Sequence, residues 1–162
     1  MPKAIISLGS NLGNRTLRLS TAISKMQHEI GDILIKSSIF ESESWGFKSE
    51  NTFLNQVLSF QTELMPEEIL KIILKIENDL GRIRVSGAYE SRTIDLDILF
   101  FDDKIINKEA LQIPHPRIQE RKFILIPLNE ILPDFVHPIS KKSIHKLLDE
   151  CQDKLWVKKF IR

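Results

Sequence analysis

Two aspartates, Asp95 and Asp97, stand two residues apart in the sequence Arg-Thr-Ile-Asp-Leu-Asp-Ile-Leu. In a β-strand this spacing points both carboxylates to one face, while Ile94, Leu96 and Ile98 point to the other. The two Cα atoms would lie roughly 6.5 to 7 Å apart, close enough for the side chains to share a pair of hard cations. A solvent-facing strand with two ordinary carboxylates is the alternative, and neighbouring residues must decide between the two interpretations.

Three arginines, Arg82, Arg84 and Arg92, precede the aspartates in a predicted loop bracketed by Gly81 and Gly87. Phosphoryl transfer needs mainly positioning and charge neutralisation, because metal ions bridge phosphate oxygens and guanidinium groups grip the transferring group. An arginine loop beside paired aspartates therefore favours this class of reaction. A solvated basic loop that binds nothing is the alternative.

Glu77 lies in the last turn of a predicted helix. The helix dipole disfavours an anion at this end, so the carboxylate is expected to have a compensating partner such as Arg82 or Arg84. Such a pair would serve a binding site or be a purely structural ion pair, and the sequence leaves both open.

Two further segments combine residue types that suit ligand binding. Phe53 and Asn55 share one face of a predicted strand, where a ring beside an amide could stack on and hydrogen-bond a flat heterocycle, although core packing is the commoner role of phenylalanine. His115 lies between Pro114 and Pro116, which predicts a rigid turn that presents an imidazole. An ordinary turn histidine is the alternative.

Composition excludes several classes of protein. The net charge of +1 provides no broad positive field for a general nucleic-acid binder. Cys151 is the single cysteine, so an internal disulfide and a thiolate metal cluster are excluded, and a reducing compartment, the cytoplasm, is expected. The apolar stretch within the first ten residues is too short for a signal-peptide core, and no apolar run of about 18 residues predicts a membrane span.

Neither a GxxxxGK[ST] loop nor a GxGxxG loop is present, which excludes the P-loop and Rossmann nucleotide sites. The residues by themselves thus indicate a metal-assisted phosphoryl or nucleotidyl transferase without naming its substrate.

Apolar periodicity predicts the order strand, helix, strand, strand, helix, strand. The predicted elements are strands 4–8, 32–42, 53–64 and 94–101 and helices 14–29 and 66–80. This order is that of a ferredoxin-like βαββαβ core of the α+β class, with an antiparallel sheet packed against two helices. Residues 143–151 are expected to cover part of the second face. No repeat or linker divides the chain, so residues 1–162 are expected to form one domain.

Taken together and in chain order, five motifs resemble the 6-hydroxymethyl-7,8-dihydropterin pyrophosphokinase family. They are SLGSNLG at 7–13, FLN at 53–55, Glu77 with GRIR at 81–84, RTIDLDIL at 92–99 and PH at 114–115. The resemblance implies an αβα sandwich with extra C-terminal elements and an ordered reaction that binds Mg-ATP before the pterin. The pterin hydroxymethyl oxygen would attack the β-phosphorus of ATP, AMP would leave, and the whole diphosphate would be transferred.

The same resemblance assigns roles to residues of this chain. Asp95 and Asp97 match the residues that hold two Mg²⁺ ions, and Arg82 and Arg92 match loop arginines that engage the phosphates. The implied ATP site consists of Glu77, Arg84, Ile98, His115 and Arg121. The implied pterin site consists of Ser42, Trp45, Phe53, Asn55 and Phe123, with the two phenylalanine rings sandwiching the pterin.

Some positions depart from the family pattern. Residues 88–91 read Ala-Tyr-Glu-Ser where an aromatic residue and then often a proline are expected, so closure of the arginine loop is expected to differ. Ala110 and Pro116 replace a basic residue and a tyrosine of some relatives, and Lys108 or Arg117 are candidates to replace those contacts with ATP.

Other functions remain as alternatives. A ferredoxin-like RNA-binding module would need clustered aromatics on the third strand, which are missing. A non-catalytic module that binds a small molecule would not need the aspartate pair, and a related metal-dependent nucleotidyl transferase would release pyrophosphate instead of AMP. A monomer is the expected oligomeric state.

Overall fold

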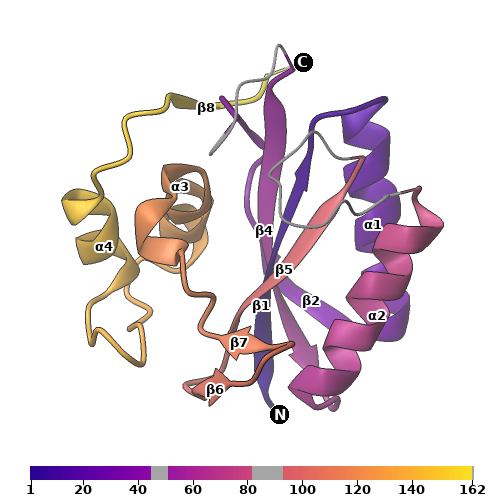
Figure 1. Ribbon diagram of the computed structural model, residues 1–162, viewed down its shortest axis with the longest axis horizontal. Helices are drawn as coiled ribbons and strands as arrows, with labels where there is room; N and C mark the ends of the chain where they lie inside the picture. Colours follow the sequence, from indigo (N-terminus) through magenta and orange to yellow (C-terminus); the bar gives the residue numbers. More distant parts are fainter. Residues whose placement is uncertain (45–50, 82–92, 162) are drawn as a thin grey trace.

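In the computed structural model, which describes residues 1–44, 51–81 and 93–161, an antiparallel sheet of six strands forms the middle layer (Figure 1). The order across the sheet is β5-β1-β4-β3-β8, and β2 also pairs with β4. The strands are β1 (Lys3–Ser10), β2 (Gly31–Lys36), β3 (Phe40–Ser42), β4 (Phe53–Thr62), β5 (Asp95–Phe101) and β8 (Val157–Lys159).

Helices cover both faces of this sheet. Figure 1 shows α1 (Arg15–Glu29) and α2 (Pro66–Asp79) on one face and α3 (Lys122–Ile131) and α4 (Ile144–Glu150) on the other. A short hairpin of β6 (Ile106–Asn107) and β7 (Gln112–Ile113) follows β5 in the chain. A 3-10 turn, Ile118–Glu120, then leads into α3. The predicted ferredoxin-like αβα sandwich is therefore confirmed, as is the placement of residues 143–151 on the second face.

Local signals account for the ends of the first two helices. The Asn14 side chain caps α1 by accepting from the Leu17 amide at 3.2 Å. At the start of α2, Pro66 occupies the first turn and the Glu68 carboxylate accepts from the Met65 amide at 3.0 Å. The chain leaves α1 through Gly31, where a Cβ would overlap the carbonyl oxygen of Gln61, so only glycine permits this close passage.

Two apolar cores lie on the two faces of the sheet. The core under α1 and α2 takes even-numbered residues of the central strand, including the fully buried Leu54, Leu58 and Phe60. The core under α3 and α4 takes Val57 and Phe100 from the sheet. Strand alternation thus separates two sets of side chains, and the first core has the pattern that the sequence predicts.

The single strand predicted over residues 32–42 is wrong, because the chain forms two strands there, β2 and β3, separated at 37–39. Both pair with β4. At the break the Ser37 hydroxyl accepts from the Val57 amide at 3.0 Å, and the Ser38 amide donates to Glu130 at 2.6 Å. The Ser37 amide still donates to the Val57 carbonyl at 2.9 Å, but polar side chains provide the other bonds at the break.

No helix of the described ranges is both long and apolar enough to span a membrane.

Candidate active site

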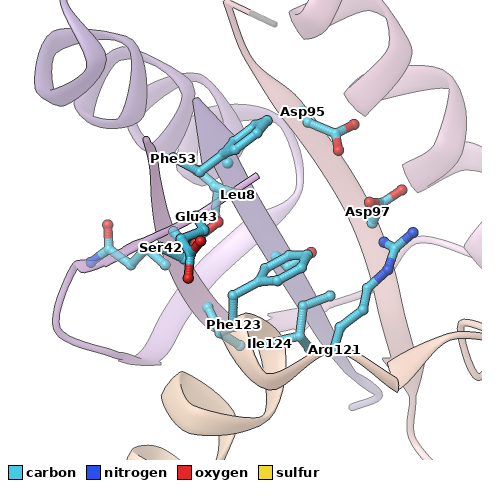
Figure 2. A pocket seen from close by; sticks show the side chains of 14 residues that line it. Leu8, Ser42, Glu43, Phe53, Asp95, Asp97, Arg121, Phe123 and Ile124 are labelled. Atoms are coloured by element: carbon cyan, nitrogen blue, oxygen red, sulfur yellow. The ribbon is translucent and has the colours of Figure 1, made fainter. Parts of the chain in front are cut away.

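The two aspartates lie on β5 and face a cavity on the α3 side of the sheet (Figure 2). The residues between and after them, Leu96 and Ile98, are 2% and 5% exposed and pack in the core under α1 and α2. The predicted alternation is therefore confirmed as far as Ile98. At Leu99 the register with β1 shifts, so Leu99 and Phe100 both join the core under α3 and α4.

Small residues of β1 leave room in front of the carboxylates. Asp97 pairs with Ser7 and Asp95 pairs with Gly9 in the antiparallel ladder. A Cβ on Gly9 would lie 3.5 Å from Asn55 Oδ1 and 3.7 Å from Phe53 Cδ1, so the missing side chain keeps open the space between β5 and β4. The absence of a side chain at this one strand position therefore leaves room for the cavity.

Across β1 from the aspartates, the cavity wall is aromatic and amide in character. Phe53 and Asn55 lie on β4, and the Asn55 Nδ2 donates to Ser42 Oγ at 2.7 Å and to the Phe40 carbonyl at 3.4 Å. The amide is buried and its orientation is fixed by these bonds. Figure 2 shows the rings of Phe53 and Phe123 projecting into the cavity from different elements, as a flat heterocycle would require.

Arg121 adds a positive charge beside the aspartates. It immediately precedes α3, is 9% exposed, and in Figure 2 its guanidinium points toward Asp97. Its Cζ lies 5.8 Å from the centroid of the Phe123 ring, so the cation and the aromatic wall are neighbours. A buried guanidinium next to carboxylates is suited to grip phosphate oxygens.

One cavity gathers these groups. The predicted site residues that line it are Ser42, Phe53, Asn55, Asp95, Asp97, Arg121 and Phe123. The aromatic and charged halves that the sequence predicted separately therefore meet in one place.

His115 lies at a neighbouring cavity that it shares with Pro114, Pro116 and His137. Its amide donates to the Leu99 carbonyl at 3.0 Å, and its Nδ1 accepts from the Arg117 amide at 3.1 Å, so the turn is rigid as predicted. Burial, with a smaller contribution from the charge of Arg121, lowers the pKa of His115 from 6.5 to about 4. The imidazole is neutral at pH 7, and Nε2 carries its N–H because Nδ1 accepts.

Two predicted ATP residues, Glu77 and Ile98, lie away from the cavity. Glu77 is 1% exposed on α2, and its Oε2 accepts from the Leu96 amide at 2.9 Å. The Leu96 amide therefore stabilises a carboxylate that the helix dipole disfavours. The bond also connects α2 to β5 at the residue between the two aspartates. The side chain of Ile98 belongs to the core on the opposite face.

The remaining predicted site residues lie outside the described residues: Trp45, Arg82, Arg84 and Arg92. Residues 88–91, where closure of the arginine loop is expected to differ, also lie outside the described residues.

Magnesium fits the donor set on β5. Within residues 1–44, 51–81 and 93–161, no cluster of three or more His, Cys, Asp or Glu side chains could hold a metal ion. Mg²⁺ is usually held by one or two carboxylates together with waters and substrate phosphates, not by a complete protein cage. Asp95 and Asp97, which both line the cavity, would supply those carboxylates.

Sequence reasoning missed part of the lining, namely Ser7, Leu8, Gly9, Gln56, Val57 and Ile124. The resemblance placed the backbone of residues 42–46 at the pterin pocket, but it did not assign a role to the Glu43 side chain. Ser7 and Gly9 had a usable signal, because they alternate with apolar Ile6 and Leu8 on the strand that must pair with the aspartates. Glu43 follows the end of β3, where strand periodicity no longer indicates which way a side chain points.

Known proteins match this chain over most of its length. The family model for 7,8-dihydro-6-hydroxymethylpterin-pyrophosphokinase matches residues 5–133. The chain is 38% identical over 150 residues to 2-amino-4-hydroxy-6-hydroxymethyldihydropteridine pyrophosphokinase of Aquifex aeolicus, covering 93% of this chain and 92% of that protein. The Porphyromonas gingivalis protein of the same name is 42% identical over 137 residues, 82% of this chain and 92% of that protein.

Longer proteins contain a similar region. The folic acid synthesis protein fol1 of Pneumocystis carinii is 45% identical over 148 residues, 91% of this chain but only 20% of fol1. A solved Plasmodium falciparum HPPK-DHPS structure with pterin and p-hydroxybenzoate has a TM-score of 0.74 at 20% identity, covering 92% of this chain and 43% of that one. That likeness supports the fold. The sequence matches and the cavity together lead to one conclusion: the chain belongs to the 7,8-dihydro-6-hydroxymethylpterin-pyrophosphokinase family.

Proposed function

We propose that this protein transfers the diphosphate of ATP to 6-hydroxymethyl-7,8-dihydropterin, giving AMP and the pterin diphosphate in folate biosynthesis. One observation carries the proposal. A single cavity joins an aromatic and amide wall, formed by Phe53, Asn55 and Phe123, to the carboxylates of Asp95 and Asp97. A substrate with a flat heterocycle at one end and a reacting oxygen at the other matches this division.

The aromatic half would bind and orient the pterin. The rings of Phe53 and Phe123 offer stacking surfaces, and the Asn55 amide, fixed by its bond to Ser42 Oγ, offers its carbonyl oxygen to an N–H group of the heterocycle. Ser42 and Trp45 belong to the same proposed pterin site. Rigid placement of the ring would hold the hydroxymethyl oxygen toward β5.

The charged half would hold the triphosphate. Two Mg²⁺ ions, held by Asp95 and Asp97, would supply charge neutralisation and orientation of the phosphates. Arg121 would contact a phosphate oxygen, and neutral His115 would donate a hydrogen bond from its Nε2–H to the nucleotide. Glu77, Arg84 and Ile98 are proposed for the ATP side, and Arg82 and Arg92 for the phosphates, on the basis of the motifs in which they stand.

In the proposed reaction the hydroxymethyl oxygen forms a bond to the β-phosphorus and loses its proton. The bond between the β-phosphorus and the oxygen shared with the α-phosphorus breaks, and that oxygen leaves with AMP. Preorganised charge at the reacting phosphate is the main contribution expected of this chain. A monomer acting in the cytoplasm is the proposed setting.

The proposal is tested by incubating purified protein with ATP, Mg²⁺ and 6-hydroxymethyl-7,8-dihydropterin and following the products by ³¹P NMR, with and without a chelator. AMP and a pterin diphosphate are expected, and the chelator should abolish both. Release of pyrophosphate would instead indicate a nucleotidyl transferase. Pterin binding that needs no Mg²⁺ and yields no product would indicate a non-catalytic binding module.

A further inference from the structure

Arg15, at the start of α1, makes several contacts with the sheet through one nitrogen. Its Nη1 donates to the Thr52 carbonyl at 3.0 Å and to Thr52 Oγ1 at 2.8 Å. The Thr52 hydroxyl in turn donates to Glu41 Oε2 at 2.7 Å, and the same Arg15 nitrogen lies 3.6 Å from that oxygen. We name Arg15, Thr52 and Glu41 the Arg15 clamp.

The Arg15 clamp is partly shielded from solvent. The side chains of Arg15 and Glu41 are 27% and 19% exposed. The Arg15 Cζ lies 5.9 Å from the ring centroid of Phe160, and Lys158 Nζ lies 3.9 Å from Glu41 Oε1, so the C-terminal strand β8 flanks the clamp. An exposed ion pair contributes little, but charge-assisted bonds to a backbone carbonyl and a hydroxyl fix a geometry.

The clamp holds two residues that each precede a wall residue of the cavity. Glu41 precedes Ser42 at the end of β3, and Thr52 precedes Phe53 at the start of β4. Ser42 and Phe53 pair with each other in the β3–β4 ladder. Because successive side chains of a strand point to opposite faces, the clamp on the α1 face fixes the backbone whose next side chains face the cavity.

The effect extends to the buried amide. Ser42 Oγ accepts from Asn55 Nδ2 at 2.7 Å, so a shift of the β3 end moves the partner that orients Asn55. The aspartates, by contrast, lie on β5, which is separated from β3 by β1 and β4. A change in the clamp therefore reaches the aromatic and amide wall before it reaches the carboxylates.

We propose that Arg15 is a positioning residue that sets the spacing of Ser42 and Phe53, and thereby the affinity of the cavity for the pterin ring, without touching either substrate. This inference rests on the proposed function for the identity of the ligand. Its geometric part, the coupling of Arg15 to Asn55 through Glu41 and Ser42, does not depend on that identity.

The test compares Arg15→Ala and Arg15→Lys with Lys142→Ala, a control that breaks the 2.8 Å ion pair of Lys142 with Glu150 beside α4. Binding of 6-hydroxymethyl-7,8-dihydropterin and of Mg-ATP is measured separately, together with steady-state kinetics. Arg15→Ala should weaken pterin binding by about tenfold, the loss expected for a charge-assisted bond, while ATP affinity and kcat change by less than about threefold. Arg15→Lys should fall between, because it retains the charge and lacks the fork.

A second readout needs no substrate. The ¹H–¹⁵N signals of the Asn55 side-chain amide should shift in Arg15→Ala and stay in place in Lys142→Ala. If Arg15→Ala does not fold, Thr52→Val removes the hydroxyl relay at nearly constant size and should move the same signals.

Unchanged Asn55 signals, or equal losses of pterin and ATP affinity in a folded variant, would overturn the positioning role. Failure of the unmodified protein to bind the pterin would count against the proposed function, and the Asn55 signals would then decide the role of Arg15 alone.

Discussion

The same strands contribute to an apolar core on one face of the sheet and to a cavity on the other face. On the face covered by α1 and α2, Leu54, Leu58 and Phe60 of β4 are all fully buried in a continuous apolar core. On the other face, the same strand presents Phe53 and Asn55 to a cavity beside the aspartates of β5. Strand alternation thus lets one strand carry stability and binding on opposite sides.

This division has an energetic consequence. Polar and charged side chains at the cavity contribute little apolar burial, whereas each large side chain on the α1 and α2 face removes apolar surface from water. Substitutions on the two faces should therefore separate activity from stability.

The largest expected effect lies on the cavity face, at Asp97. Asp97→Ala should lower kcat by about 10² to 10⁴, because several kcal/mol of charge neutralisation at the transferring phosphate would be lost. The free energy of unfolding should stay within about 1 kcal/mol, since no core side chain is removed. Product formation and urea unfolding are measured on the same sample. A folded variant with near-normal turnover would contradict the role assigned to Asp97.

Leu58→Ala should do the opposite on the core face. This side chain is 0% exposed, so its truncation should lower the free energy of unfolding by about 2 to 5 kcal/mol. The folded fraction should keep its kcat, because Leu58 points away from the cavity. Chemical denaturation and active-site titration measure the two quantities, and Asn55→Ala is the matched variant on β4. Should Leu58→Ala lower the kcat of the folded fraction, the two faces would not be independent.

The two faces also differ in how far the sequence predicts them. The stripe of Ile69, Ile73 and Ile76 on α2 and the alternation of β4 repeat regularly, so helices, strands and the core between them follow from periodicity. The cavity depends on single positions. Gly9 acts by lacking a side chain. Arg121 and Phe123 come to the sheet from the start of α3, far along the chain, and the family resemblance predicted them where periodicity could not.

Other features were missed because the regular pairing of the strands is interrupted. Ser37 interrupts what periodicity predicts as one strand, by accepting from the Val57 amide. The register shift at Leu99 turns two successive residues to the same face and frees the Leu99 carbonyl for His115. Patterns with a period of two residues cannot anticipate either event.

Acid should destabilise the cavity side of the molecule. Because burial lowers the pKa of His115 to about 4 from 6.5, the unfolded chain takes up a proton between these pH values that the folded protein does not. The free energy of unfolding should fall as the pH drops from 6.5 to 4, by at most about 3 kcal/mol, and this contribution should be constant above pH 6.5.

Urea unfolding at a series of pH values measures how the free energy of unfolding changes with pH. His115→Gln should reduce this slope. Burial also lowers the pKa of His137, so His137→Gln is the companion variant with an effect of the same sign. If His115→Gln left the slope unchanged, His115 would not be held neutral by the fold.

The smallest effect is expected at Gly9, where one substitution should raise stability and weaken pterin binding. The added Cβ of Gly9→Ala would meet Asn55 Oδ1 at 3.5 Å and Phe53 Cδ1 at 3.7 Å, which are ordinary contacts, so the fold should tolerate it. Replacing a strand glycine lowers the entropy of the unfolded chain, so the free energy of unfolding should rise by about 0.5 kcal/mol. The same methyl group would occupy space between the aromatic wall and Asp95, and the KM for the pterin should increase about fivefold, equivalent to about 1 kcal/mol. Pterin binding should therefore weaken while stability increases. Steady-state kinetics and thermal unfolding of this one variant measure the two effects. A variant with a raised KM and lowered stability would show instead that Gly9 is required by the strand itself and not by the cavity.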